Sequence, residues 1–347
     1  MDEERGRPAK RPTIADVAAL AGVSRAAVSK VFNDSGRISE PTALRIRDAA
    51  AKLHWTPSST AVALRKTRTQ TVGLVLNRPG ELEVGATSSL LISGVESVLT
   101  PRGYGLLMYL VDRGLDEEAR TYQRLSDNRR VDGVILTDSR VGDNRFSLTR
   151  SLGLPAVLIG TPWENDVIPH VDSDPPGAGV DDSVRHLVEL GHRRIAYVGG
   201  PVDRVQAVLR RITFEESMSA AGLVPTATVA TDYSPASAAA HTAALLRREV
   251  RPTGILYGSD TMAIGGMQAA REAGYSVPQD LSIVGFDGLP LGVWVDPALT
   301  TVQRDAVQRG RIVAMRMLDL LGESLEEPPL LSRPYLVVRG STAAAPE

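Results

Sequence analysis

The sequence predicts a small N-terminal all-α domain followed by a larger α/β body with two lobes. Three observations lead to this fold class. The chain has 347 residues, more than one ordinary domain holds. Its first part has apolar residues at helical spacing, whereas the remainder alternates short apolar runs with longer periodic segments. The alternation stops near residues 170–177 and then resumes, which indicates two lobes.

Composition excludes several classes of protein and site. The chain contains no cysteine, which excludes disulfides, thiolate metal sites and cysteine nucleophiles. No apolar run is long enough to cross a bilayer, and the N-terminus MDEERGRPAKRP is charged where a signal peptide needs an apolar core. The five histidines do not cluster at metal-ligand spacing. We therefore expect a cytoplasmic protein that uses no metal, cofactor or membrane.

Positive charge is concentrated at the N-terminal end. Residues 1–70 contain 13 Lys/Arg and 7 Asp/Glu, a net charge of +6, whereas residues 71–347 have a net charge of −8. A basic segment on an acidic body indicates that only the N-terminal part binds a polyanion. Chance clustering on a solvated surface is the alternative, so the pattern within the segment has to decide.

Two short helices around a tight turn are predicted over residues 13–33. Thr13 followed by Asp16 is a capping-box-like start, and Gly22 allows the left-handed conformation that ends a helix. Ser24 is placed to cap the second helix. Apolar residues at helical spacing are expected to pack inward: Ile14, Val17, Ala18, Ala21, Val28 and Val31.

A third helix is predicted from near Pro41 to about Leu53, because proline is tolerated in a first helical turn. Leu44, Ala49 and Leu53 are expected to complete a small three-helix core. The three helices together predict a helix-turn-helix domain over residues 10–57.

The exposed start of the second helix is a candidate for contacts with DNA bases, since this part of a helix-turn-helix enters the major groove. Arg25 can donate two hydrogen bonds to a guanine, and alanine methyl groups suit a thymine methyl. The candidate base-facing residues are Ser24, Arg25, Ala26, Ala27, Ser29 and Lys30. The candidate phosphate contacts at helix starts and loops are Thr13, Asn33, Arg37 and Thr42. A three-helix bundle without a DNA function is the alternative, which the basic surroundings disfavour.

The body contains two series of apolar runs that predict strands. The first series comprises residues 71–77, 104–111, 131–138 and 155–160, and the second comprises residues 194–200, 228–233, 254–259 and 282–288. Continuous apolar strands separated by helices predict parallel sheets that are covered on both faces.

Ligands of open α/β sheets bind beyond the carboxyl ends of the strands. Polar residues end or directly follow the predicted strands: Asn77, Arg78, Asp138, Asp172, Tyr233, Ser259, Asp260 and Asp287. Carboxylates and an arginine can pair with hydroxyls while a ring covers an apolar sugar face, so this set suits a sugar. Structural alternatives stand beside this interpretation, because Asp260 resembles a helix cap and Tyr233 suits half-buried packing.

Residues 13–65, from TIADVAALAGVSRAAVSKVFN to TPSSTAVALR, are similar to the opening of the lactose-repressor (LacI/GalR) family. The resemblance implies a sequence-specific transcription regulator with a hinge helix within residues 58–70, which orders on DNA and inserts a leucine into the minor groove. By position that leucine is Leu64, and Ala61 permits close packing of two hinge helices. Ser58 replaces the family's usual asparagine. A flexible linker is the alternative for the same stretch.

The body is similar to the same family in the segments HLVELGHRRIAYVGGP, ILYGSDTMAIGGMQAAREAGYSVPQDLSIVGFDG and PALTTVQRD. The resemblance implies a periplasmic-binding-protein-like sensor for a small effector. By position Arg210 matches the family's ligand-clamping arginine, and Asp287 its main carboxylate. Ser259 stands at its usual asparagine and Tyr233 at an aromatic residue that lines the pocket. We interpret His192 as structural.

Three departures from the family pattern limit the ligand prediction. Ser259 offers one hydroxyl instead of a two-headed amide, Thr213 stands where a glycine is usual, and Gly160 lacks a carboxylate that some sugar binders have. They leave open a different sugar or a ligand that is not a sugar. Arg78 and Arg145 are candidates for an anionic group, although we favour a free surface position for each.

These observations predict a homodimeric regulator, a repressor, that binds a pseudo-palindromic operator in double-stranded DNA. The predicted sensor spans residues 71–342, with a first lobe of about 71–172 and 304–333 and a second of about 173–303 and 334–342. A sugar-like effector between the lobes is expected to modulate operator affinity. The expected effector-binding residues are Asn77, Arg78, Asp172, Arg210, Tyr233, Ser259 and Asp287.

Two other functions are disfavoured. An enzyme is disfavoured because no GxGxxG follows the first strand and no P-loop, HExxH or GxSxG is present. A solute-binding protein of a transporter is disfavoured by the missing export signal and by the basic N-terminal domain.

Overall fold

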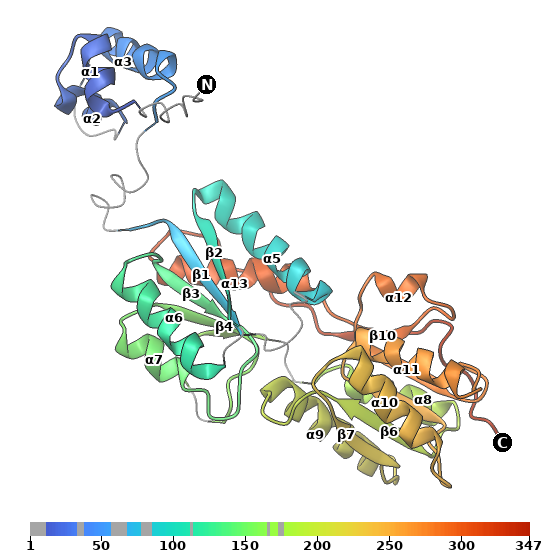
Figure 1. Ribbon diagram of the computed structural model, residues 1–347. Helices are drawn as coiled ribbons and strands as arrows, with labels where there is room; N and C mark the ends of the chain where they lie inside the picture. Colours follow the sequence, from blue (N-terminus) through green and yellow to red (C-terminus); the bar gives the residue numbers. More distant parts are fainter. Residues whose placement is uncertain are drawn as a thin grey trace, which may run out of the picture. The chain divides into compact units, whose positions relative to one another are not determined.

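The computed structural model describes residues 12–32, 38–56, 68–77, 85–111, 114–164, 167–172 and 177–347. The chain divides into two compact units, residues 1–69 and residues 70–347. The first unit is helical and the second contains two sheets, as Figure 1 shows. The predicted fold class is confirmed. No helix in the described part of the chain is long and apolar enough to cross a membrane.

The first unit consists of helices α1 (Ile14–Ala21), α2 (Arg25–Phe32) and α3 (Glu40–Lys52). The Asp16 carboxylate accepts a hydrogen bond of 2.7 Å from the Thr13 backbone N–H at the start of α1. Gly22 has a φ of +63° and ends α1. The Ser24 hydroxyl accepts a hydrogen bond of 3.1 Å from the Ala27 N–H and caps α2. These local features are as the sequence predicts.

The core of the first unit differs in one position from the prediction. Leu44 is 54% exposed, so its predicted core position is wrong, and Ile46 is fully buried instead. Ile46, Ala49 and Leu53 share one face of α3 at helical spacing, whereas Leu44 lies two residues, or about 200°, away from Ile46. The buried residues are Val17, Ala18, Ala21, Val28, Ile46, Ala49 and Ala50.

A parallel five-stranded sheet forms the first lobe of the second unit, in the order β2-β1-β3-β4-β5. Its strands are β1 (Thr71–Asn77), β2 (Gly105–Val111), β3 (Gly133–Leu136), β4 (Ala156–Ile159) and β5 (His170–Val171). Its helices are α5 (Ala86–Leu99), the 3₁₀ turn η1 (Thr100–Arg102), α6 (Leu115–Asp127), α7 (Arg145–Ser151) and, from much later in the chain, α13 (Ala306–Leu320).

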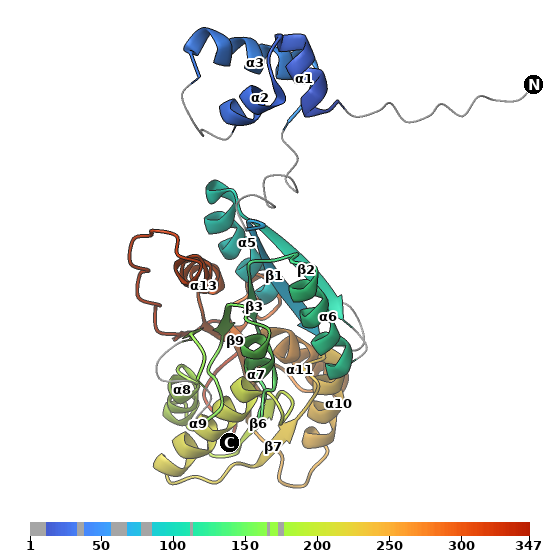
Figure 2. The same cartoon turned by 90° about the vertical axis from the view of Figure 1, so that its left-hand side faces the viewer.

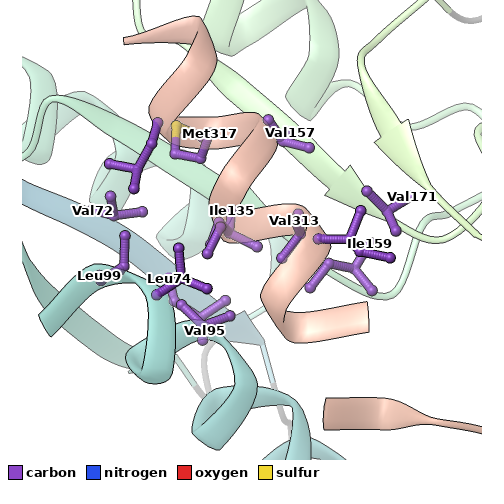
Figure 3. Close-up of a cluster of buried hydrophobic side chains, with 14 of the residues drawn as sticks. Val72, Leu74, Val95, Leu99, Ile135, Val157, Ile159, Val171, Val313 and Met317 are labelled. Atoms are coloured by element: carbon purple, nitrogen blue, oxygen red, sulfur yellow. The ribbon is translucent and has the colours of Figure 1, made fainter. Parts of the chain in front are cut away.

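Alternate residues of the first sheet face two separate cores. Leu74, Ile135 and Val157 pack against α5 and α13, as Figure 3 shows, whereas Val75 and Val134 pack on the side of α6 and α7. This two-sided burial explains why the strands are continuously apolar in sequence.

A six-stranded sheet forms the second lobe, in the order β11-β10-β9-β8-β6-β7, with only β11 antiparallel to its neighbour. Its strands are β6 (Ile195–Gly199), β7 (Ala227–Ala230), β8 (Gly254–Tyr257), β9 (Ser282–Asp287), β10 (Thr300–Gln303) and β11 (Tyr335–Val337). Its helices are α8 (Val180–Glu189), α9 (Val205–Ala220), α10 (Pro235–Leu246), α11 (Asp260–Glu272) and α12 (Leu291–Trp294), which Figures 1 and 2 show around the sheet.

Each of the eight predicted strands overlaps a strand of the structure. The predictions missed β5, β10 and β11, which are short. Strand β10 begins with Thr300 and Thr301, whose polar side chains hide the strand from an apolar-run search although both are fully buried.

The chain passes between the two lobes three times: after β5, between β10 and α13, and between α13 and β11. Asp172 directly follows β5, and Arg304 directly follows β10. The lobes are therefore joined by chain segments that carry charged residues at their ends, which is where the candidate site lies.

Candidate functional site

The surface of the helix-turn-helix unit presents most of the predicted DNA-contacting side chains. Arg25, Ala26 and Lys30 are exposed on α2, as are Thr13 and Ser24 at the starts of α1 and α2. The half-buried predicted residues are Ala27, Ser29 and Thr42. The predicted residues Asn33, Arg37, Ala61 and Leu64, and the neighbouring Ser58, lie outside the described residues.

The Ser24 cap fixes the N-terminal end of α2, the end that is expected to contact bases. Ser24 holds its first turn, so the Arg25 and Ala26 side chains start from a fixed position at the N-terminal end of the helix. This end of the recognition helix in a helix-turn-helix faces the base edges. A guanidinium followed by a methyl side chain can therefore approach a major groove without steric hindrance from a bulky neighbour.

A pocket lies between the two lobes of the second unit, where the chain passes from one to the other. It contains about 280 Å³ of space outside the protein atoms, part of it open to solvent. Its lining residues are Asp172, Gly177, Ala178, Gln206, Leu209, Arg210, Phe286 and Arg304. The pocket thus brings together Asp172 and Arg210 of the predicted effector site.

Arg210 is held in place on three sides. Its Nη1 donates a hydrogen bond of 2.6 Å to the Gly258 carbonyl, and its guanidinium carbon lies 3.8 Å from the centre of the Phe286 ring. Its Nη2 lies 3.9 Å from the Asp287 carboxylate. The charge of this buried guanidinium is therefore balanced by one carboxylate, a carbonyl and the face of an aromatic ring.

Two arginines of the site are not among the sequence predictions. Arg309, on α13, donates a hydrogen bond of 2.8 Å to the Asp172 carboxylate. The Nη atoms of Arg304 lie 3.5 Å from the Asp172 carboxylate and 3.6 Å from that of Asp287. Burial and the neighbouring Arg309 and Arg210 charges lower the pKa of Arg304 to about 9, so it is still charged at neutral pH. Arg304 directly follows β10, so the sequence identifies it as a strand-end residue only where β10 itself is predicted.

Three predicted strand-end residues have left-handed backbone conformations. The φ angles are +52° at Asp138, +69° at Tyr233 and +123° at Asp287. Such conformations cost roughly 1–3 kcal/mol for residues other than glycine and cluster at functional sites. The Tyr233 ring packs against the backbone of Gly200, where a side chain would not fit, and its hydroxyl is buried with no partner among the described residues.

Arg145 belongs to a buried ion cluster in the first lobe, so our preference for a free surface position is wrong. Its guanidinium lies 2.6 Å from the Asp143 carboxylate and 3.2 Å from that of Glu118, and it is 2% exposed. Burial alone would raise the pKa of Asp143. The hydrogen bond and the charge of Arg145 outweigh this effect and hold the pKa below its usual range. Asn77 donates to Glu118 over 3.0 Å. The second candidate for an anionic group, Arg78, lies outside the described residues.

The start of α11 corrects the expected role of Asp260. Ser259 is the residue that caps the helix, through a hydrogen bond of 3.3 Å from the Met262 N–H. Asp260 is fully buried and accepts hydrogen bonds from the Leu289 N–H at 2.6 Å and from the Thr301 hydroxyl. Burial raises the pKa of Asp260 to about 6. Asp260 therefore ties α11 to the segments after β9 and within β10.

Two further polar residues connect distant segments of the chain, His192 away from the pocket and Asp138 beside it. His192 is fully buried, and its ring nitrogens lie 2.9 Å from the hydroxyls of Thr253 and Ser282. Asp138 accepts a hydrogen bond of 3.2 Å from Gln206 of the second lobe. The described residues contain no cluster of three or more side chains suited to hold a metal ion.

Comparison with known proteins adds two family matches. Residues 13–58 match the family model of bacterial regulatory proteins of the lacI family, and residues 184–342 match that of a periplasmic binding protein-like domain.

Similar proteins cover nearly the whole chain. The chain is 31% identical to the HTH-type transcriptional regulator CelR of Thermobifida fusca, over 96% of this chain and 98% of the relative. It is 30% identical to the ribose operon repressor of Escherichia coli strain K12 (95% and 99%) and 29% identical to the HTH-type transcriptional repressor PurR of Vibrio atlanticus (95% and 98%).

Solved structures give the same result. The lac repressor dimer bound to operator and the anti-inducer ONPF matches with a TM-score of 0.84 at 27% identity, covering 96% of this chain and 100% of that one. The complex of the transcriptional regulator CelR with cellobiose matches with a TM-score of 0.71 at 31% identity, covering 95% and 100%.

Proposed function

The chain belongs to the LacI family of DNA-binding transcription regulators, with a periplasmic-binding-protein-like effector domain, and we propose that a small sugar-like effector, bound between its lobes, changes its affinity for its operator. It is a regulator and not an enzyme. The observation that carries the proposal is the pocket between the lobes, whose wall includes Asp172 after β5, Arg210 on α9 and Arg304 after β10.

The position of this pocket supports the proposal that the effector acts through the arrangement of the two lobes. A ligand that contacts groups of both lobes stabilises one arrangement of the lobes over another, and only such a difference in affinity shifts the population. We propose that the effector contacts Asp172 on one side and Arg210 with Asp287 on the other. Asn77, Arg78, Tyr233 and Ser259 stay proposed contributors to the same site.

A sugar suits this pocket better than a purine. Arginine and carboxylate groups form paired hydrogen bonds with hydroxyls. Stacking of a purine uses a free aromatic face, and the Arg210 guanidinium already covers one face of the Phe286 ring in the pocket at 3.8 Å. The solved complex of the relative CelR contains cellobiose, which supports a sugar. Purines serve as the alternative in the test.

We propose that residues 10–57 read the operator and that residues 58–70 form the hinge, with Leu64 in the minor groove and Ala61 permitting close packing of two hinge helices. Arg25, Ala26 and Lys30 are the exposed base-facing candidates. Helix α12 supports the proposed homodimer, because Leu291, Val293 and Trp294 are all exposed on this four-residue helix. Apolar patches of this kind mark protein–protein interfaces. A symmetric dimer predicts a pseudo-palindromic operator.

Two measurements on the full chain test the proposal. Selection from a random duplex library is expected to yield a pseudo-palindrome, and a mobility-shift assay then measures its affinity. A thermal-shift panel of neutral sugars, sugar acids, sugar phosphates and purines is expected to give a ligand that changes this affinity. A true ligand at a hundredfold excess over its Kd adds roughly 2.7 kcal/mol of stability.

Matched variants localise the ligand. Arg210→Gln is expected to abolish the ligand-induced thermal shift, whereas Arg271→Gln, which changes an exposed arginine on α11, is expected to keep it. Selection of random sequences without a shared motif would contradict the regulator mechanism. A ligand that binds Arg210→Gln and wild type equally would contradict the proposed site.

A further inference from the structure

The charges around the pocket between the lobes do not balance among the described residues. The guanidinium groups of Arg210, Arg304 and Arg309 face two carboxylates, those of Asp172 and Asp287. The neighbouring Asp138 and Arg204 add one charge of each sign and contact each other, since Arg204 donates a hydrogen bond of 3.1 Å to the Asp138 carbonyl. The buried Asp260, which interacts with Asp287, and the nearby Arg339 likewise add one charge of each sign. Among the described residues, one positive charge is therefore left without a matching carboxylate.

The uncompensated charge is on Arg304. Asp172 is already used by Arg309 at 2.8 Å and by the Thr161 hydroxyl at 2.8 Å. The Asp172 and Asp287 carboxylates lie 3.5 and 3.6 Å from Arg304, and its guanidinium donates no hydrogen bond to any residue that the structure describes. Five N–H donors in a fixed planar fork are thus available beside a pocket that Arg304 itself lines.

We infer that the effector carries an anionic group, a carboxylate or a phosphate, which binds the Arg304 guanidinium at the passage between the lobes, with Arg210 beside it. This inference rests on the proposed function and specifies the class of its ligand. The two-oxygen edge of a carboxylate or phosphate matches the guanidinium fork. The neighbouring Arg210 raises the local positive potential, and the Phe286 ring, 3.8 and 5.5 Å from the Arg210 and Arg304 guanidinium carbons, forms an apolar wall beside both.

The position of Arg304 gives the anion a role in signalling. Arg304 directly follows β10 and precedes α13, which belongs to the other lobe. Arg309 at the start of α13 holds Asp172, which follows β5. An anion on Arg304 would therefore contact the connection between β10 and α13 directly. Because the Arg304 guanidinium also lies 3.5 Å from Asp172 on the connection after β5, its binding energy would act on the relative arrangement of the lobes.

The test uses the full chain with inorganic phosphate as the probe. Thermal unfolding is measured in sodium phosphate and in sodium chloride at equal ionic strength and pH, for wild type, Arg304→Gln, Arg304→Lys and the exposed control Arg271→Gln. Phosphate is expected to raise the Tm of wild type and of Arg271→Gln above the chloride value. Arg304→Gln is expected to bind phosphate at least tenfold more weakly, and Arg304→Lys to recover part of the affinity.

Matched ligand pairs then identify the source of the anionic group. Galactose is compared with galacturonate for a carboxylate, and glucose with glucose 6-phosphate for a phosphate. The wild-type comparison keeps the test valid if Arg304→Gln fails to fold. The inference is overturned if phosphate stabilises wild type no more than chloride does, or if it stabilises Arg304→Gln equally.

Failure of the anionic ligand class and failure of the proposed regulator function give different results. A neutral sugar that needs Arg210 but not Arg304 would overturn the anionic class and leave the regulator mechanism in place. Loss of specific operator binding would instead contradict the proposed function, whatever phosphate does.

Discussion

Two glycines let the backbones of α5 and α13 touch where these helices cross. A Cβ on Gly94 would collide with the Val307 carbonyl oxygen and lie 3.0 Å from its carbonyl carbon and 3.1 Å from the Arg311 nitrogen. A Cβ on Gly310 would collide with the Leu91 carbonyl and lie 3.1 Å from the Gly94 Cα. Backbone atoms cannot rotate away as side chains do, so the helices would have to separate.

The expected cost of Gly94→Ala follows from this geometry. Overpacking costs typically about 1–3 kcal/mol, and rigid backbone on the other side puts this site at the upper end. Replacing glycine with alanine inside a helix by itself stabilises the helix by roughly 1 kcal/mol. We therefore expect a net loss of about 2 kcal/mol, which lowers the Tm of a domain this large by roughly 5 °C.

Ligand binding is expected to weaken together with stability, because Arg309 adjoins Gly310. Moving α13 away from α5 stretches the 2.8 Å bond between Arg309 and Asp172 at the pocket. Urea unfolding and ligand-induced thermal shift are measured for Gly94→Ala and Gly310→Ala. Gly292→Ala on α12 is the control, since its Cβ would meet Leu299 at an ordinary 3.5 Å. Wild-type stability in both α5 and α13 variants would refute the close-crossing argument.

Three further predictions address other parts of the chain. Arg25→Ala is expected to cost about 1–3 kcal/mol of operator binding and to relax specificity at one base pair, which competition against random DNA checks; equal loss on both DNAs would contradict base contact. Since burial raises the pKa of Asp260 to about 6, its protonated form stabilises the fold at low pH and this contribution is lost as pH rises through 6. The unfolding free energy of wild type relative to Asp260→Asn should thus fall by up to about 3 kcal/mol from pH 4 to 7, and a flat difference would contradict the buried-acid assignment. Trp294→Glu is expected to weaken the homodimer in analytical ultracentrifugation, while an unchanged dimer would place the interface elsewhere.

Local signals in the sequence were sufficient for most of the fold. Gly22, Ser24 and the Thr13–Asp16 pair carry their turn and cap chemistry within a few residues, so they could be identified without tertiary information. The long apolar strands are recognisable for the same reason, since burial on both faces requires continuous apolar side chains.

The missed features depend largely on contacts between distant segments. Arg145 looks exposed in sequence, but besides the adjacent Asp143 it has a second partner, Glu118, which lies 27 residues earlier on a different helix. Asp260 has the typical sequence of a cap, yet its partners Leu289 and Thr301 lie on later segments. Arg304 was missed because the buried threonines of β10 do not form an apolar run. The pairing that produces a charge excess could not be predicted before these segments were placed together.

The threading of the chain through both lobes has a genetic consequence. A stop codon shortly after α13 would leave the strands β1–β5 and the helices on them complete, yet it would remove β11, which pairs with β10. It would also remove Ser341, whose buried hydroxyl donates to Ile283 and accepts from the Thr300 N–H at 2.8 Å. Nonsense mutations near the 3′ end of the gene should therefore damage the second lobe selectively. Chimeric regulators should exchange the body as one piece, because neither lobe corresponds to a continuous stretch of coding sequence.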